Sequence, residues 1–122
     1  MGKTILAIDD EQMMLDFYQI VLAEFGEVRA AINLKDARSQ LEGVDLIVLD
    51  FYLQQDQYLI QELIPELTKA APVLLCSGIQ DVMVPTMGAK FGIAGYWNKG
   101  SDHDKLRSLV RSVLTQSTPA SG

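Results

Sequence analysis

The chain has 122 residues, of which 48% are hydrophobic and 21% charged, and its formal net charge is −6 at pH 7. This length and balance indicate one soluble globular domain with a buried core, rather than a disordered chain. The acidic balance argues against a nucleic-acid surface, which needs clustered Lys and Arg. The first apolar run is too short for a signal peptide or a membrane span, so we expect a cytoplasmic protein that binds no membrane.

Five short apolar runs alternate with longer amphipathic segments along the chain. This alternation is typical of an α/β domain in which helices cover both faces of a parallel sheet. We expect the strands at residues 4–8, 28–32, 45–49, 73–77 and 94–98. The second run alternates imperfectly, as an edge strand does.

Two helices are expected in the first third of the chain. The first should run over residues 12–25 and stop at Gly26. The second should begin at Asn33, with Asp36 in its first turn, and end at Gly43. The residues of the first helix that we expect to face inward are Met14, Phe17, Val21 and Phe25.

Proline and capping patterns predict the later helices. Pro65 should kink or split the third helix, and Pro85 should lie in the first turn of the fourth. Ser101 and Asp104 resemble a capping box at the start of the last helix. The apolar stripe expected on that helix consists of Leu106, Leu109, Val110, Val113 and Leu114.

Polar residues follow the expected strands at their carboxyl ends, where parallel sheets collect ligands. Asp9 and Asp10 follow the first strand and Asp50 the third, while Ser77 and Lys99 stand at the ends of the fourth and fifth. Two carboxylates about 5 Å apart repel by roughly 3 kcal/mol at an effective dielectric near 20. A divalent cation reverses that repulsion, and oxygen ligands suit Mg²⁺. A carboxylate at such a site also has the chemistry of a nucleophile towards phosphorus.

Three other reactive or aromatic residues are expected to be structural. Cys76 lies within an apolar run and should be a buried thiol, since a single cysteine forms no internal disulfide. His103 lies in a polar stretch without a second His or Cys, so we expect a solvated residue near a helix start rather than a zinc ligand. Trp97 should belong to the core.

With these residues in place, the chain resembles a response-regulator receiver domain, the phosphoaccepting module of two-component signalling. The resemblance implies a flavodoxin-like fold, a single doubly wound sheet of five parallel strands in the order 2-1-3-4-5. The resemblance runs from Lys3 to about Leu114. Residues 1–115 are expected to form the receiver domain, and residues 116–122 a flexible tail or the stub of a linker. The residues that carry the resemblance are Asp9, Asp10, Asp50, Ser77, Gly78, Tyr96 and Lys99.

The resemblance implies that Asp50 is phosphorylated by a histidine kinase or a histidine phosphotransfer protein. Asp10 and Asp50 would bind Mg²⁺ directly, the Tyr52 carbonyl would be a third ligand, and Asp9 would act largely through water. Lys99 would contact the phosphoryl group.

Ser77 would move towards the phosphoryl group and Tyr96 would turn inward, reshaping the face formed by the fourth helix, fifth strand and fifth helix. The output is an unknown partner or domain, and a homodimer that forms on phosphorylation stays open. Such a domain is no enzyme beyond catalysing its own phosphorylation and dephosphorylation.

The chain departs from the family pattern after two of its site residues. Leu53, Gln54 and Tyr58 replace a Met-Pro pair and a Gly after Asp50, and Gly100 replaces the usual Pro after Lys99. These changes put the geometry of both loops in question but remove no charged group of the site.

Three alternatives remain open. The altered loop after Asp50 motivates a pseudo-receiver, which would bind partners without phosphorylation. A phosphatase of the haloacid-dehalogenase type would need an acid where Tyr52 stands, and a cap domain. A flavin-binding flavodoxin relative would need a phosphate-cradling loop, where Asp9, Asp10 and Glu11 would repel the phosphate.

Overall fold

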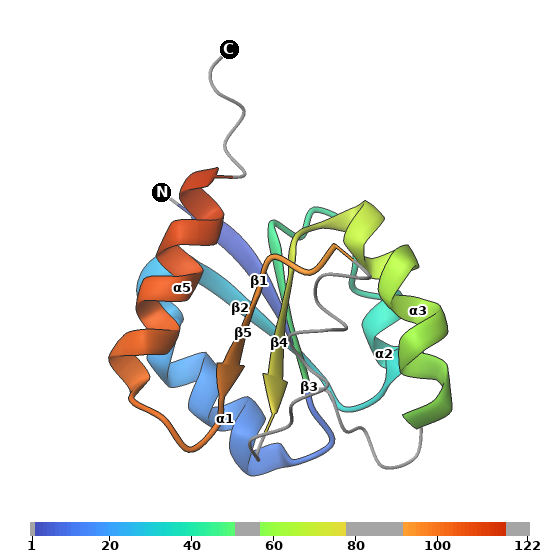
Figure 1. Ribbon diagram of the computed structural model, residues 1–122, viewed down its shortest axis with the longest axis horizontal. Coiled ribbons are helices and arrows are strands. Elements are labelled where there is room, and N and C mark those ends of the chain that lie inside the picture. Colours follow the sequence, from blue (N-terminus) through green and yellow to red (C-terminus); the bar gives the residue numbers. More distant parts are fainter. Residues whose placement is uncertain (1, 51–56, 78–91, 117–122) are drawn as a thin grey trace.

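The computed structural model describes residues 2–50, 57–77 and 92–116, and these contain a parallel sheet (Figure 1). Its order is β2-β1-β3-β4-β5, and every ladder is parallel. The predicted fold class and strand order are confirmed, and each strand begins and ends within two residues of its predicted position. The strands are β1 (Lys3–Ile8), β2 (Gly26–Ala31), β3 (Leu46–Asp50), β4 (Val73–Ser77) and β5 (Gly95–Asn98).

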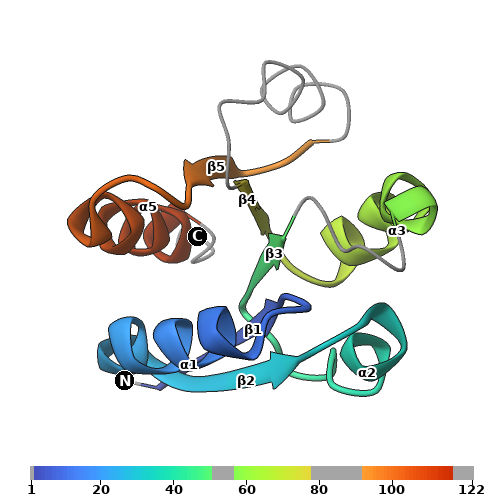
Figure 2. The ribbon, with the colours of Figure 1, turned by 90° about the horizontal axis from the view of Figure 1, so that it is seen from below.

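The helices form a layer on each face of the sheet. Figure 2 shows α1 and α5 on one face and α2 and α3 on the other. Within the described ranges, none of the helices has both the length and the apolar character needed to cross a bilayer. The helices are α1 (Gln12–Val21), the 3₁₀ helix η1 (Ala23–Phe25), α2 (Leu34–Arg38), α3 (Gln57–Ala70) and α5 (His103–Gln116).

Two hydrophobic cores lie between the sheet and its helix layers. Alternate residues of each strand point to opposite faces, so Leu6 and Ile8 pack with α2 and α3, while Ile5 and Ala7 pack with α1 and α5. The central strands β3 and β4 are buried along their whole length. This burial on both faces explains why the strands read as continuous apolar runs rather than as alternating patterns.

The predicted inward face of α1 was only partly right. Val21 is buried, and Met14, Phe17 and Phe25 are partly buried against the same core, but the prediction missed the buried Leu15 and Tyr18. Helix α1 also ends at Val21 instead of Phe25, because the chain tightens into η1 before Gly26 starts β2. Apolar side chains occur on almost every face of this segment, so the helical period alone did not identify the buried one.

The predicted start of α2 is confirmed, but its end is not. The Asn33 side chain accepts a hydrogen bond from the Asp36 backbone N–H at 2.8 Å, as a helix cap does. Helix α2 then ends at Arg38, well before Gly43, which adopts φ 77° in the following turn. Glycine favours this left-handed conformation in any turn, so it did not mark the helix end.

The start of α5 differs from the predicted capping box. The Asp102 side chain accepts from the Asp104 backbone N–H at 3.0 Å, while the Ser101 hydroxyl donates to the Asn98 carbonyl at 2.6 Å. Ser101 therefore belongs to the turn before the helix. The apolar stripe is confirmed: Leu109 is partly buried, and the buried members are Leu106, Val110, Val113 and Leu114.

Pro65 does not split α3, which continues through it. A proline removes one backbone donor, and a helix of 14 residues retains its other bonds. The expectation for Pro85 lies outside the described residues. Helix α5 includes Gln116, the first residue of the predicted tail, and the rest of that tail also lies outside the described residues.

Candidate functional site

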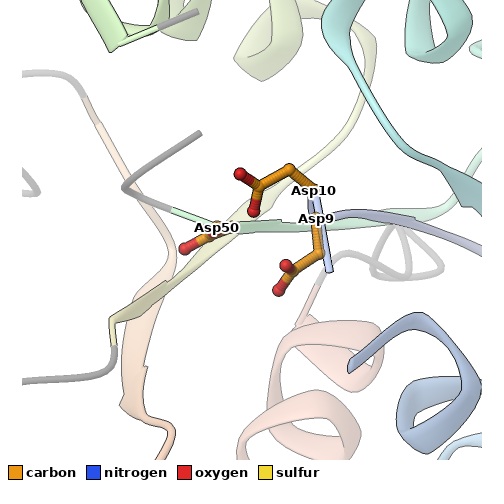
Figure 3. A group of neighbouring side chains, drawn as sticks. All are labelled: Asp9, Asp10 and Asp50. Atoms are coloured by element: carbon orange, nitrogen blue, oxygen red, sulfur yellow. The ribbon is translucent and has the colours of Figure 1, made fainter. Parts of the chain in front are cut away.

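Three carboxylates gather at the carboxyl edge of the sheet (Figure 3). Asp9 and Asp10 follow the end of β1, and Asp50 is the last residue of the neighbouring strand β3. One carboxylate oxygen from each residue lies within 4.8 Å of the others. The register places Ile8 opposite Leu49, so the parallel ladder itself delivers the two strand ends to one place.

The cluster is largely withdrawn from solvent. Asp9 is 0% exposed and Asp50 4% exposed, whereas Asp10 is intermediate. The Asp9 backbone N–H donates to the Ala31 carbonyl at 3.1 Å, and its Oδ1 accepts from the Glu11 N–H at 3.0 Å. These two bonds hold the Asp9 carboxylate at the strand end.

Lys99 brings an ammonium group to the cluster. Its Nζ lies 2.8 Å from Asp9 Oδ2 and 3.3 Å from Asp50 Oδ1, and the Lys99 side chain is 13% exposed. Burial lowers the pKa of Lys99, but the hydrogen bond to Asp9 and the charge of Asp50 more than offset that effect, so the pKa lies above its ordinary value. Lys99 is therefore protonated and partly neutralises the acids.

The donor set fits a hard divalent cation. Three carboxylates against one ammonium leave two formal negative charges, which a dication neutralises. All the available ligand atoms are oxygens, and Asp10 keeps part of the cluster open to water. Mg²⁺ prefers oxygen ligands and retains several waters when bound, so this group of residues suits it.

The sheet also brings Ser77 to this edge. Asp50 pairs with Cys76 across β3 and β4, and Ser77 pairs with Asn98 across β4 and β5. Ser77 is 3% exposed, and its carbonyl accepts the Lys99 backbone N–H at 2.7 Å. Ser77 and Lys99 therefore lie at the ends of adjacent strands, β4 and β5, at the same edge of the sheet as the acids.

The two aromatic residues of β5 face opposite sides. Trp97 is 3% exposed and packs in the core with α1 and α5, as predicted, and its ring stacks on Phe17 at 6.0 Å between centroids. Tyr96 is 50% exposed. The predicted site elements Tyr52 and Gly78, and the altered positions Leu53 and Gln54, lie outside the described residues.

Two features of the site had not been predicted. Glu11, directly after the acidic pair, places a fourth carboxylate 3.9 Å from Lys99 Nζ. The hydroxyl of the buried Tyr18 lies against the Cys76 thiol. Burial is the main reason why the pKa of Tyr18 is raised, Cys76 adds to it, and the charges of Asp9 and Asp50 raise it further. The adjacency of Glu11 was a visible signal, whereas nothing in the sequence pairs Tyr18 with Cys76.

Cys76 is a buried free thiol, and His103 is exposed at the start of α5, as predicted for both. Burial raises the pKa of the Cys76 thiol from 9.0 to about 12, although the Tyr18 hydroxyl acts in the opposite direction. The thiolate is the reactive form of cysteine. Cys76 is therefore an inert core residue.

The raised pKa of Cys76 predicts a loss of stability in alkali. The unfolded chain releases this proton above pH 9.0, while the folded chain holds it to about pH 12, so stability is full below this window and falls as pH rises through it. Between about pH 8 and about pH 10, wild type should lose on the order of 1 kcal/mol more unfolding free energy than Cys76→Ala. Urea unfolding with a reductant measures this difference, and equal losses in the two proteins would contradict the prediction.

No protein-family model and no curated protein matches the chain, but solved structures match its fold. NtrX from Brucella abortus, solved in complex with ADP, superposes with a TM-score of 0.83 at 24% identity; the match covers 96% of this chain and 27% of NtrX. A CheY-like response regulator receiver domain protein from Methanospirillum hungatei gives 0.83 at 20% identity, covering 96% and 97% of the two chains. The BeF3-activated DrrB receiver domain gives 0.81 at 24% identity, covering 94% and 99%.

The chain thus spans about a quarter of NtrX but nearly the whole of the isolated receiver domains. Their shared feature is the parallel sheet in the order 2-1-3-4-5 with helices on both faces. The flavodoxin-like fold of this chain is that of response-regulator receiver domains.

Proposed function

We propose that the chain is the phosphoacceptor switch domain of a two-component system and that Asp50 receives the phosphoryl group. The observation that carries this proposal is the convergence of Asp9, Asp10 and Asp50 with Lys99 at one strand edge. The fold likeness to receiver domains supports it. The domain acts on no separate substrate and catalyses only its own phosphorylation and dephosphorylation.

Phosphorylation joins a carboxylate oxygen of Asp50 to the phosphorus of a phosphohistidine. As this P–O bond forms, the P–N bond of the donor breaks and its electron pair stays on the imidazole nitrogen, which takes up a proton. The developing charge lies on the phosphoryl oxygens. Lys99, already 3.3 Å from Asp50, is placed to bind one of these oxygens.

The acidic residues would hold Mg²⁺ as the cofactor, with Asp10 and Asp50 as direct ligands, the Tyr52 carbonyl as a third, and Asp9 acting through water. When bound, Mg²⁺ would supply positive charge beside the transferred phosphoryl group. Ser77 would donate a hydrogen bond to the phosphoryl group.

Tyr96, half exposed, would turn inward as Ser77 moves and change the face that β5 and α5 form with the fourth helix expected from the sequence. The phosphodonor would be a histidine kinase or a histidine phosphotransfer protein, acting in the cytoplasm. The changed face would control an unknown output partner or domain, or a homodimer formed on phosphorylation. Residues 1–115 would form the receiver, and residues 116–122 a tail or linker stub.

The geometry favours this switch over the alternatives. A pseudo-receiver has no need of a buried acidic cluster, whose repulsion costs stability when no cation is bound. A phosphatase of the haloacid-dehalogenase type would need an acid at position 52, where the chain has Tyr52. We therefore propose a phosphorylation-dependent domain.

Incubation with acetyl phosphate and Mg²⁺, followed by intact-mass measurement, tests the proposal. We expect one phosphoryl group on wild type, none when EDTA replaces Mg²⁺, and none on Asp50→Asn, because the nucleophile is gone. Asp104→Asn is the matched control, since Asp104 lies at the start of α5 with a side chain 79% exposed and pairs with Arg107. It should be modified like wild type. An unmodified wild type, or a modified Asp50→Asn, would reject the proposal.

A further inference from the structure

The turn between β5 and α5 is organised by Asn98. Its side-chain Oδ1 accepts the Gly100 backbone N–H at 2.9 Å. Its backbone carbonyl accepts the Ser101 N–H at 2.9 Å and the Ser101 hydroxyl at 2.6 Å. Three hydrogen bonds thus converge on one residue and enclose Lys99, which lies between Asn98 and Gly100.

Gly100 contributes a backbone N–H to this arrangement. A Cβ at position 100 would lie 3.4 Å from Asn98 Oδ1, which is ordinary van der Waals contact, so packing alone does not require glycine there. The turn requires a backbone donor at position 100, which a proline lacks.

Hydrogen bonds fix the backbone on both sides of the turn. On the strand side, the Lys99 backbone N–H donates to the Ser77 carbonyl at 2.7 Å. On the helix side, the buried Trp97 donates its indole N–H to the Asp102 carbonyl at 3.3 Å, and the Asp102 side chain accepts from the Asp104 N–H. The one stretch of backbone between these anchors is the segment that Asn98 closes.

We propose that Asn98 is a positioning residue for phosphoryl transfer, because the hydrogen bond from the Gly100 N–H to its side-chain Oδ1 sets the backbone from which the Lys99 ammonium reaches Asp9 and Asp50. The inference rests on the proposed function of the site. The hydrogen bonds of Asn98 described above join it to Gly100 and Ser101 and not to a carboxylate. Asn98 would therefore act on the site through Lys99, which contacts Asp9 and Asp50.

Asn98→Ala should slow phosphorylation by acetyl phosphate about tenfold or more, because displacing a catalytic group by about 1 Å can reduce the rate by that factor. Mg²⁺ should bind as tightly as in wild type or more tightly, because a loosened ammonium competes less for the carboxylates. General damage to the fold would weaken both properties together. Trp97, the one tryptophan of the chain, gives a fluorescence signal for the Mg²⁺ titration.

Conservative variants and a double mutant separate positioning from general structure. Asn98→Asp keeps an oxygen acceptor and Asn98→Ser keeps a weaker one, so phosphorylation should recover in that order relative to Asn98→Ala. Adding Asn98→Ala to Lys99→Met should cause no further loss, because the residue would act only through Lys99. Full additivity of the two losses, or wild-type phosphorylation of Asn98→Ala, would overturn the inference.

NMR provides a readout that does not depend on phosphorylation. In Asn98→Ala, the Lys99 side-chain nitrogen signal should move, and the Lys99 backbone amide should exchange faster with solvent. An unmodified wild type would reject the proposed function while leaving this measurement decisive for Asn98. Unchanged Lys99 signals in Asn98→Ala would reject the positioning role whatever the outcome of phosphorylation.

Discussion

Lys99→Met should lower the unfolding free energy by about 3–5 kcal/mol in EDTA, the cost of leaving a buried charge without its partner. Lys99 Nζ lies 2.8 Å from Asp9 and 3.3 Å from Asp50, whose side chains are 0% and 5% exposed. Methionine keeps the length and packing of the side chain but carries no charge. Two nearly buried carboxylates would then face each other and Asp10 without an ammonium.

Mg²⁺ should restore much of this loss, since a cation that binds only the folded chain adds about 2.7 kcal/mol at a hundred times its dissociation constant. The variant should also bind Mg²⁺ more tightly than wild type, because no ammonium competes for the same oxygens. Urea unfolding with EDTA or Mg²⁺ measures both effects. A loss that Mg²⁺ does not reduce would show that Lys99 matters through packing instead of charge.

Lys105→Met provides the matched control, because Lys105 is exposed on α5. Its unfolding free energy should stay within about 0.5 kcal/mol of wild type and respond to Mg²⁺ as wild type does. Comparing Lys99→Met with Lys105→Met separates the effect of losing a charge beside the acidic cluster from the effect of losing any one lysine.

The strands could be predicted because buried strands consist almost entirely of apolar residues, which is visible in the sequence. In β3 and β4 every residue is buried, so apolar side chains run without interruption and only the polar strand ends break them. Parallel order then forces those polar ends to one edge of the sheet. The meeting of Asp9, Asp10 and Asp50 follows from this topology and needs no knowledge of any side-chain rotamer.

The face of α1 was harder to predict because its sequence is apolar around most of the helix. Met13 is 81% exposed and Ile20 77% exposed, although both types are usually counted as core residues. Tyr18 is buried in a core that also contains Cys76, a residue of a strand far along the chain. Contacts between distant segments of this kind have no local sequence signal.

The turn after β5 was missed for a related reason. One of its hydrogen bonds depends on the direction of the Asn98 side chain, and the two others are accepted by the Asn98 backbone carbonyl. Replacement of the family's proline by glycine was visible in the sequence, but it indicated only a different loop. The hydrogen bond between the Gly100 N–H and the Asn98 side chain is visible only in the structure.

Gly26→Ala should be among the most destabilising single substitutions in this chain, costing about 4 kcal/mol or more. Gly26 adopts φ 139°, which side chains rarely allow, and an added Cβ would lie 2.1 Å from the Lys3 carbonyl oxygen and 2.6 Å from the Lys3 nitrogen. Both of these atoms are backbone, and Lys3 is the ladder partner of Gly26. The strands β1 and β2 must therefore separate at this end.

Two other glycines separate the contributions of the steric clash and of the backbone strain to this loss of stability. At Gly43, φ is 77° but no atom lies within 4 Å of an added Cβ, so Gly43→Ala should cost only the backbone strain, about 1–2 kcal/mol. Gly2 has neither a positive φ nor a neighbour within 4 Å, and Gly2→Ala should be close to neutral. Urea unfolding of the three variants measures this order, and equal losses in Gly26→Ala and Gly43→Ala would show that the clash is relieved without cost.

The effect of Gly26→Ala should reach the acidic cluster. The far end of β2 supplies the Ala31 carbonyl that accepts the Asp9 N–H at 3.1 Å. If β2 shifts against β1, Asp9 loses one of the two bonds that hold it, and the remaining folded protein should bind Mg²⁺ more weakly than wild type. Gly43→Ala, which leaves that ladder untouched, should retain wild-type Mg²⁺ binding. A single glycine in the edge strand would then influence the position of an acid at the opposite end of the sheet.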